Sequence, residues 1–347
     1  MTKTFEITSR RGIRWTMGAI VFLLLMGFLG DIALAQGGGV ADHVVISEVQ
    51  VADEEFIELY NPTNADIDMT GWHWCYFSST RDWNDPLRDK TFLEGATIPA
   101  HGFYLIATTA DEFPDADWNF DYSTHLLSNS AGSIGIFPWD PNEKTAEEAK
   151  NGRIDAVGYG SVDHVKENSE AEVPSAAQSI ERKAQSTSTA ETMGPGGADD
   201  VRGNGYDSND NSQDFVLRDS PEPQNSSSAS ETPFGPPVTV TVSAFPLTIP
   251  ADGTSGATIT ATVSDTVGCV ADGTVVTFTT NLGSFPSDPY TNTTASGVAT
   301  ATLTSEKTAD TAHVTATADS ASGGVDVIFA EVYKLFMPLI VKNFTAM

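Results

Sequence analysis

Short runs of hydrophobic and aromatic residues recur along the chain, separated by clusters of turn-forming residues such as Asn61-Pro62, Pro99 and Pro138. β-Branched and aromatic residues with this spacing are typical of the strands of a sandwich or barrel. Only Glu143–Lys150 has a helical pattern, with a solvated loop as its alternative. The predicted strands of the first region are Val44–Val51, Phe56–Tyr60, Trp72–Phe77, Gly102–Ala107, Ser133–Phe137, Ile154–Gly158 and Gln178–Arg182.

A second region, residues 238–330, is rich in Thr, Val and Ala, with hydrophobic residues at every second position. Side chains alternate between the faces of a strand, so these residues are predicted to point inward. They are Ala257, Ile259, Ala261 and Val263, and then Ala312, Val314, Ala316 and Ala318. The fold class is therefore all-β, with a larger sandwich over residues 42–224 and a smaller one over 238–330. Between them the Ser-rich and Pro-rich segment 225–237 is predicted to be a linker.

The N-terminal segment 1–35 has the layout of a secretory signal peptide. Basic residues precede the apolar run Ala19–Leu29, and Ala33-Leu34-Ala35 provides small residues for cleavage before Gln36. An uncleaved membrane anchor is the alternative, but it requires about 20 apolar residues, and this run is shorter. The short apolar C-terminal tail, residues 331–347, is interrupted by Pro338 and is also too short to span a bilayer. We therefore expect an exported protein whose mature chain has no transmembrane span.

The formal net charge of -29 disfavours nucleic acid as a partner, and none is expected, because nucleic-acid affinity depends on Lys and Arg neutralising phosphates. The two cysteines, Cys75 and Cys269, fall in different predicted domains. Each is either a small buried hydrophobic residue or half of an interdomain disulfide, and the sequence leaves both alternatives open because nothing in it determines their separation.

The first region resembles the lamin tail domain, an Ig-like fold that also occurs in secreted bacterial proteins. The residues that carry the resemblance are Val45–Val49, Phe56–Pro62, Met69–Trp72, Ala96–Tyr104, Leu127–Ser130, Ile154–Tyr159, Ser179–Arg182 and Asp214–Phe215. The resemblance implies an interaction or structural module without a catalytic centre of its own. The sequence departs from the family pattern by insertions around Trp83–Arg88 and Glu143–Asn151. Long loops on a sandwich are where we expect a binding site.

The second region resembles a bacterial Ig-like domain of group 1, the kind found in invasin and intimin. Phe245–Gly253, Ala271–Phe278 and Gly297–Thr304 carry this resemblance. It implies a rigid spacer in a surface protein. A single copy is present here, which argues against a long stalk.

The segment from Asp207 to Asp214 offers closely spaced oxygen ligands for calcium. Asp207, Asn209 and Asn211 match the first three ligand positions of a calcium-binding loop, and Asp214 adds another carboxylate. The rest of that template fails, because Ser212 and Arg218 stand where the turn Gly and the bidentate Glu are required. Calcium at Asp207, Asn209, Asn211 and Asp214 is therefore a hypothesis, with an ordinary solvated loop as its alternative. No other cofactor is predicted.

Trp72, Trp74 and Tyr76 alternate along one predicted strand and so share a face. An exposed aromatic strip of this kind stacks on sugar rings, whereas a buried strip fills a core. We predict core packing, because aromatic residues at strand period usually lie inside.

Other catalytic and metal-binding patterns are weak in this sequence. A catalytic pair of carboxylates, as in glycoside hydrolysis, is one hypothesis for Glu48, Glu54, Glu55 and Glu58. Nothing in the sequence determines the distance between two of these carboxyl groups, and we expect Glu58 to brace a turn. Nucleophile-elbow and phosphate-loop motifs are absent from the sequence. The six histidines stand singly, so the sequence predicts no zinc site; they are His43, His73, His101, His125, His164 and His313.

Together these features predict a non-catalytic secreted or cell-surface protein with a role in adhesion. The first domain is expected to bind a partner, an envelope protein or a polysaccharide, and the second to act as a spacer. The alternatives are an extracellular hydrolase or its accessory subunit, and a glycan-binding module. The oligomeric state is not predicted.

Overall fold

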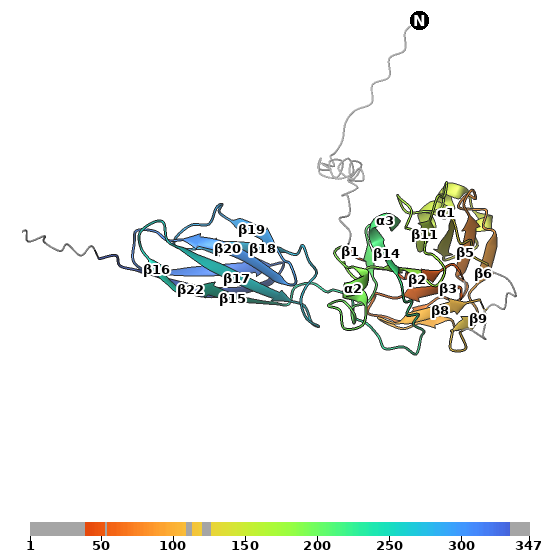
Figure 1. Ribbon diagram of the computed structural model, residues 1–347, viewed down its shortest axis with the longest axis horizontal. Helices are drawn as coiled ribbons and strands as arrows, with labels where there is room; N and C mark the ends of the chain where they lie inside the picture. Colours follow the sequence, from red (N-terminus) through yellow and green to blue (C-terminus); the bar gives the residue numbers. More distant parts are fainter. Residues whose placement is uncertain (1–38, 53, 109–112, 120–125, 334–347) are drawn as a thin grey trace, which may run out of the picture. The chain divides into compact units, whose positions relative to one another are not determined.

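The computed structural model describes residues 39–52, 54–108, 113–119 and 126–333. This part of the chain forms two β-sandwiches, one before residue 219 and one after residue 238 (Figure 1). The predicted all-β class with two Ig-like sandwiches is confirmed. The predicted signal peptide and the tail beyond residue 333 lie outside the described residues. No helix among the described residues is long and apolar enough to cross a membrane.

The first sandwich consists of two main sheets that contain all seven predicted strands, with shifts of one residue at some ends, and also β6, β9 and β14, which the sequence pattern does not predict. The smaller sheet has the order β11-β10-β5-β6, and the larger has the order β14-β12-β2-β3-β8-β9. The smaller sheet contains β5 (His73–Ser78), β6 (Arg88–Thr91), β10 (Gly132–Phe137) and β11 (Asp155–Tyr159). The larger contains β2 (Val45–Gln50), β3 (Phe56–Tyr60), β8 (Phe103–Ala107), β9 (Trp118–Asn119), β12 (Ser179–Arg182) and β14 (Phe215–Arg218).

Two short strand pairs and four short helices are the other elements among the described residues of this domain. The pairs are β1 (Gly39–Val40) with β13 (Tyr206–Asp207), and β4 (Ile67–Asp68) with β7 (Thr97–Ile98). The helices are η1 (Pro141–Glu143), α1 (Ala146–Gly152), α2 (Ala190–Met193) and α3 (Asn211–Asp214). The helix α1 overlaps the predicted segment Glu143–Lys150 but begins three residues later and ends two residues later. Thr145 and Glu148 form a reciprocal capping box that sets its start.

The core of the first sandwich lies between its two main sheets and contains the aromatic strip. Trp74 is fully buried, Tyr76 is nearly so, and Trp72 packs against the same core. Trp74 also makes an edge-to-face contact with Trp118, with ring centroids 6.5 Å apart. Core packing is therefore confirmed, and Trp74 and Tyr76 offer no exposed face for stacking on a sugar ring.

The second sandwich follows the period-two pattern of its sequence. Ala257, Ile259, Ala261 and Val263 point into its core, as do Ala312, Val314, Ala316 and Ala318, as predicted. One sheet contains β15 (Thr239–Phe245), β17 (Gly256–Ser264) and β20 (Val298–Thr304). The other contains β16 (Thr248–Pro250), β18 (Val275–Thr280), β19 (Tyr290–Thr293), β21 (Thr311–Ala318) and β22 (Ala321–Ala330).

The first part of the predicted linker is bonded to the first sandwich. The amide of Asn225 donates to the carbonyl of Asp115 at 2.8 Å, and the backbone N–H of Ser226 donates to Asp117 at 2.9 Å. Further along, the hydroxyl of Tyr60 donates to the carbonyl of Glu231. The segment from Asn225 to Glu231 therefore covers part of the first domain.

Both cysteines are free thiols, Cys75 buried and Cys269 exposed. The alternative of a disulfide between them is therefore not realised in this structure. Cys75 fits the other alternative, a small buried residue, whereas Cys269 does not.

Replacing Trp74 by Ala should destabilise the first sandwich by about 3–5 kcal/mol, because it leaves a large cavity in a closed core. Urea denaturation followed by tryptophan fluorescence measures this, since Trp72, Trp83, Trp118 and Trp139 all remain in the same domain. Leu93→Ala, at a side chain that is 69% exposed, is the matched control and should change stability little. Equal stability of the two variants would contradict the burial of Trp74.

Candidate functional site

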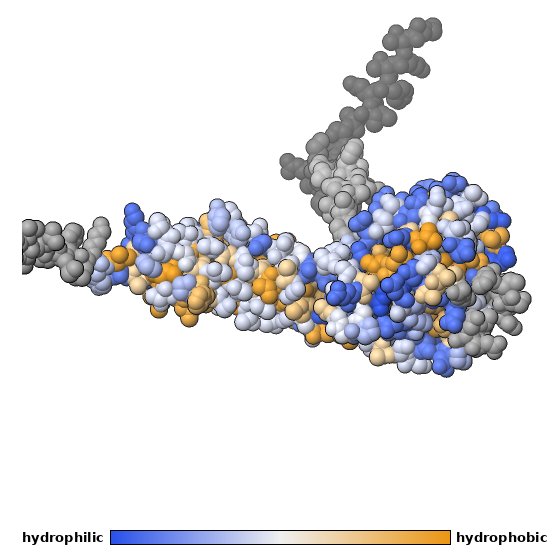
Figure 2. All heavy atoms as spheres, viewed as in Figure 1, coloured by the Kyte–Doolittle hydropathy of each residue, from blue (hydrophilic) through white to orange (hydrophobic). Residues whose placement is uncertain are grey.

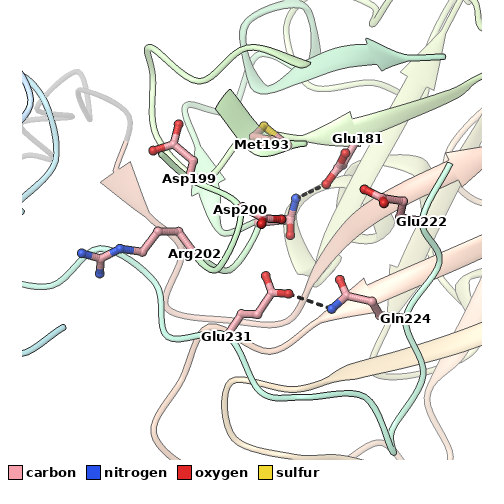
Figure 3. A pocket seen from close by; sticks show the side chains of 9 residues that line it. Glu181, Met193, Asp199, Asp200, Arg202, Glu222, Gln224 and Glu231 are labelled. Atoms are coloured by element: carbon pink, nitrogen blue, oxygen red, sulfur yellow. Dashed lines mark hydrogen bonds between the residues drawn. The ribbon is translucent and has the colours of Figure 1, made fainter. Parts of the chain in front are cut away.

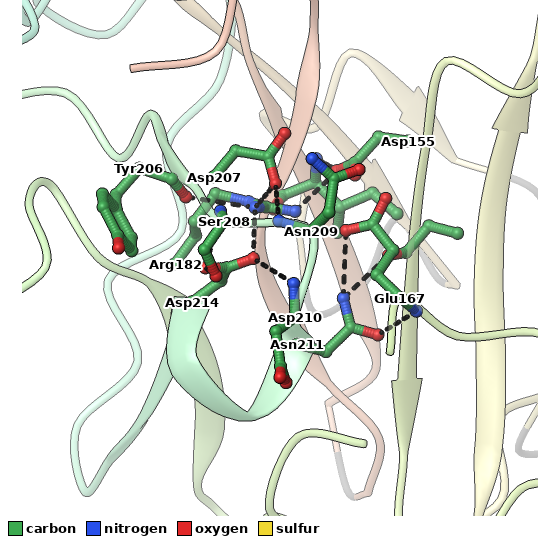
Figure 4. A network of polar contacts seen from close by, with 12 residues as sticks. Asp155, Glu167, Arg182, Tyr206, Asp207, Ser208, Asn209, Asp210, Asn211 and Asp214 are labelled. Carbon is green, nitrogen blue, oxygen red and sulfur yellow. Dashed lines mark hydrogen bonds and ion pairs between the residues drawn. The ribbon is translucent and has the colours of Figure 1, made fainter. Parts of the chain in front are cut away.

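The fully buried side chain of Arg182, at the end of β12, organises a polar network in the first sandwich (Figure 4). Its Nη2 lies 2.8 Å from Oδ2 of the fully buried Asp155, and its Nε donates to the carbonyl of Ile46 at 2.8 Å. The guanidinium also lies over the ring of Phe215, 4.7 Å from the centroid. A cation so far from water is stable only when it is paired and hydrogen-bonded, as it is here.

Two of the four predicted calcium ligands face this guanidinium. Oδ1 of Asp207 lies 3.8 Å from Nη1 of Arg182, and Oδ2 of Asp214 lies 3.7 Å from it. Carboxylate oxygens of Asp207, Asp214 and Glu167 lie within 4.8 Å of one another. The fold therefore brings Asp207 and Asp214 together as expected, and it adds Glu167 and a cationic side chain that the local spacing does not reveal.

The other two predicted ligands have different surroundings. The amide of the fully buried Asn211 is used by the protein itself: its Oδ1 accepts from the backbone N–H groups of Gly158 and Glu167, and its Nδ2 donates to the carbonyl of Ala156. Asn209 is exposed at a left-handed turn, with φ of 56°, and its N–H donates to Asp207. Asn211 thus acts as a brace, and calcium binding by this loop stays a prediction that rests on Asp207 and Asp214.

Burial changes the protonation of these groups. It raises the pKa of Asp214 to about 6, although Arg182 acts in the opposite direction. It also raises the pKa of Glu167 to about 8, with a further contribution from Asp155. For Arg182, burial opposes the charge, but the surrounding carboxylates outweigh it and raise the pKa. The guanidinium is therefore charged throughout the physiological range.

The opposite face of the same sheet carries a ladder of three glutamates. Glu58, Glu48 and Glu181 lie directly opposite one another on β3, β2 and β12. Ser47 donates to Glu58 at 2.5 Å, and the hydroxyl of Ser179 donates to Glu48. Like charges at directly opposed positions destabilise a sheet, so the ladder favours protonated carboxyl groups.

The pKa values of the ladder follow from this arrangement. Burial and then Glu181 raise the pKa of Glu48 to about 8, and burial and then Glu48 raise that of Glu58 well above its usual value. Burial raises the pKa of Glu181 to about 7 against the opposing effect of Arg218. The expectation that Glu58 braces a turn was wrong in part: it lies within a strand, and its Oε2 accepts from the backbone N–H of Gln224 at 2.5 Å.

A polar cavity of about 220 Å³ opens beside the end of this ladder (Figure 3). Glu181 is shared by the ladder and the cavity, whereas Glu48 and Glu58 are 2% exposed and do not line it. Five carboxylates line the cavity: Glu181, Asp199, Asp200, Glu222 and Glu231.

The carboxylates of the cavity are held in place by neighbouring polar groups. Asn204 donates to Glu181 at 2.7 Å, and Gln224 donates to Glu231 at 2.8 Å. Arg218 lies 2.7 Å from Glu181 and 2.8 Å from Glu222. Burial raises the pKa of Glu231 to about 7. Arg202 also lines the cavity, but it is paired with Asp265 at 3.1 Å, so the excess of acidic side chains suits a cationic group better than an anionic one. No local motif in the sequence marks this arrangement.

Two family models match the chain, and both resemblances are confirmed. The Lamin Tail Domain model matches residues 39–161, and the model of the Bacterial Ig-like domain (group 1) matches residues 239–330. The chain therefore combines one domain of each kind. The first match ends after β11, so β12, β14 and the carboxylates of the cavity lie beyond it. No curated protein matches the chain.

Several solved structures are similar to parts of this chain. The adhesin InvE of Yersinia pseudotuberculosis is 27% identical over 26% of this chain and 26% of that chain, with a TM-score of 0.24. Invasin, described as a bacterial integrin-binding protein, is 16% identical over 85% of this chain and 39% of that chain, with a TM-score of 0.27. A DUF4876 family protein from Bacteroides thetaiotaomicron is 14% identical over 55% of this chain and 74% of that chain, with a TM-score of 0.34. The match to InvE spans about a quarter of that protein.

Replacing Arg182 by Leu should destabilise the first sandwich by about 3–5 kcal/mol, because Asp155 is then buried without its cation. Arg81→Ala is the matched control, since it breaks an equally short but partly exposed ion pair with Asp85 and should cost no more than about 1 kcal/mol. Urea denaturation measures both variants. A loss for Arg182→Leu as small as that for Arg81→Ala would contradict the central role of the buried pair.

The stability of the first sandwich should fall as the pH rises from about 5 to about 8. Glu48 keeps its proton in the folded state up to about pH 8 but loses it near pH 4.5 in the unfolded state. The stabilisation present at low pH is therefore lost as the pH rises between these two values. Each such carboxyl contributes a slope of about 1.4 kcal/mol per pH unit between its two pKa values.

The test compares urea denaturation at pH 5, 6, 7 and 8 for the wild type and Glu48→Gln. The amide imitates the protonated carboxyl, so the variant should show a shallower decline. Glu143→Gln, at an exposed position, should leave the slope of the wild type unchanged. A Glu48→Gln slope as steep as that of the wild type would show that Glu48 is ionised in the fold.

Proposed function

We propose that this is an exported, non-catalytic interaction protein of the cell surface or its surroundings, in which the first sandwich binds a partner and the second acts as a spacer. The observation that carries the proposal is the contrast between the two domains: a cavity lined with acidic side chains in the first and a Thr-rich surface with few charges on the strands of the second. The two family matches support it, since domains of these kinds are generally non-catalytic.

The partner should present a cationic segment to the first sandwich. Complementary charge steers encounter and selects among partners. The cavity offers five acidic side chains, of which Glu181 and Glu231 are only partly ionised at neutral pH, because burial raises the pKa of each to about 7. Figure 2 shows strongly hydrophilic residues on the first sandwich in this view, with hydrophobic ones between them. Between the two partners expected from the sequence, these charges favour a basic region of an envelope protein over a polysaccharide.

The second sandwich has the properties of a spacer. The outward positions of its strands are mostly occupied by Thr, as at Thr258, Thr262, Thr300, Thr302 and Thr315. β-Branched residues stiffen a strand, and threonines rarely act as anchors of a protein interface, a role that Trp, Tyr and Arg dominate. Figure 2 shows this domain mostly near the middle of the hydropathy scale.

The test is affinity capture of envelope proteins by the mature chain, comparing the wild type with the double variant Asp200→Asn/Glu222→Gln. We expect the wild type to capture a basic protein in a salt-sensitive manner, and the variant to bind it about tenfold more weakly, a change of about 1.4 kcal/mol.

The matched control is Glu306→Gln/Asp310→Asn, which removes the same charge from exposed positions of the second sandwich. It should bind like the wild type. Binding that depends on Glu306 and Asp310 but not on Asp200 and Glu222 would reverse the roles of the two domains.

A further inference from the structure

The two insertions that depart from the lamin tail pattern pack on a small hydrophobic cluster of their own. Trp83 from the first insertion and Ala149 from the second are buried there with Cys75, Phe77 and Phe137. The amide of Asn84 donates to the carbonyl of Lys144 at 2.9 Å, which joins the two insertions directly. The guanidinium of Arg153 lies over the ring of Trp83, 5.2 Å from its centroid. These loops therefore have defined positions relative to the strands beneath them.

Three side chains with metal-ligating atoms converge at the edge of this cluster. His73 lies on β5, Asp89 lies on β6, and Asp140 is the residue that caps η1. His73 and Asp89 share a face of the sheet, because Cys75 pairs with Asp89 and His73 pairs with Thr91. One ligand atom from each of the three side chains lies within 4.8 Å of the others, and Nδ1 of His73 is 2.6 Å from Oδ1 of Asp89.

Neighbouring groups orient all three side chains. Nδ2 of Asn142 donates to Oδ1 of Asp140 at 2.9 Å and to Oδ2 of Asp89 at 3.2 Å, so one amide turns both carboxylates toward the same place. The other ring nitrogen of His73 lies 3.4 Å from the hydroxyl of Thr91. Partners of this kind, which fix the ring and the carboxylates from outside, accompany metal ligands in proteins.

The site is only partly buried. The side chain of His73 is 12% exposed and that of Asp89 is 23% exposed, which leaves a path for an ion to enter. A second His–Asp pair, His313 with Asp326, has the same 2.6 Å separation, but it is about 60% exposed, and it belongs to no such three-residue group among the described residues. The pair of His73 and Asp89 thus has a third ligand nearby and is more buried than the pair of His313 and Asp326.

We propose that His73, Asp89 and Asp140 bind a divalent transition-metal ion of the zinc type. An imidazole nitrogen with two carboxylate oxygens is a donor set that zinc accepts, with ligand distances near 2.0–2.2 Å. Calcium and magnesium prefer oxygen ligands alone, so the imidazole disfavours them. The charge of the ion balances the two carboxylates, and water completes the coordination. This site is distinct from the predicted calcium loop and joins strands β5 and β6, at the edge of the sheet, to the start of η1.

The experiment is isothermal titration of the mature chain with zinc chloride after removal of metals by a chelator. The wild type should bind one zinc ion per chain, and zinc should raise its melting temperature. Asp140→Asn should weaken this binding at least about tenfold, since even the loss of a supporting partner costs that much. Asn is also a good helix cap, so this variant should keep η1 intact. His73→Asn should lose the ion altogether.

The matched control is His313→Asn, which removes the other histidine of a close His–Asp pair and should bind zinc like the wild type. Near-ultraviolet circular dichroism checks that each variant is folded. If His73→Asn does not fold, the comparison of Asp140→Asn with the wild type still tests the proposal. A wild type that binds no zinc would overturn the proposal. So would zinc binding that is the same in the wild type, Asp140→Asn and His73→Asn, because the ion would then lie elsewhere on the acidic surface.

Discussion

The buried ion pair between Arg182 and Asp155 is the constraint on which the first sandwich depends. Strand β12 pairs with β2 only at Ile180 and Glu181, and β2 has an irregularity between Ile46 and Glu48. At Ile46, side chains supply the hydrogen bonds that the partner strand does not. Asp155 accepts from the N–H of Ile46 at 2.6 Å, and Arg182 donates to the carbonyl of Ile46. Since Asp155 belongs to β11 in the other sheet, one ion pair both completes the hydrogen bonding of β2 and joins the two sheets.

The two neighbouring residues at the end of β12 face opposite sides of the sheet and organise opposite surfaces. Arg182 points to the network that holds Asp207, Asp214 and Glu167, whereas Glu181 points to the glutamate ladder and the cavity. Both surfaces contain more carboxylates than cations, and burial raises several of their pKa values, as for Glu48 and Asp214. The acidic composition of the chain is therefore partly a property of its interior, where protons and arginines balance the carboxylates.

The departures from the lamin tail pattern have a structural role of their own. The insertions at 83–88 and 143–151 bring a second hydrophobic cluster, and the three residues His73, Asp89 and Asp140 converge beside it. The residues of the family pattern, by contrast, mostly form the sandwich core, as Ile57 and Leu59 do. In this domain the shared residues build the scaffold, and the added loops pack beside the three residues proposed to bind an ion.

The amino-acid sequence by itself determined seven strands of the first sandwich and the direction of the side chains in the second, because alternation and turn residues are local properties. It did not reveal β6, β9 or β14. Phe56–Tyr60 agrees with β3 at both ends, and every inward position named for the second sandwich is buried. Local spacing also singled out Asp207 and Asp214. Only the tertiary structure decided that Arg182 and Glu167 join them, that Asn211 is a brace, and that His73 meets Asp89 and Asp140. These groups are brought together by strand register and by loops that pack from distant parts of the chain, and no short stretch of sequence encodes such distances.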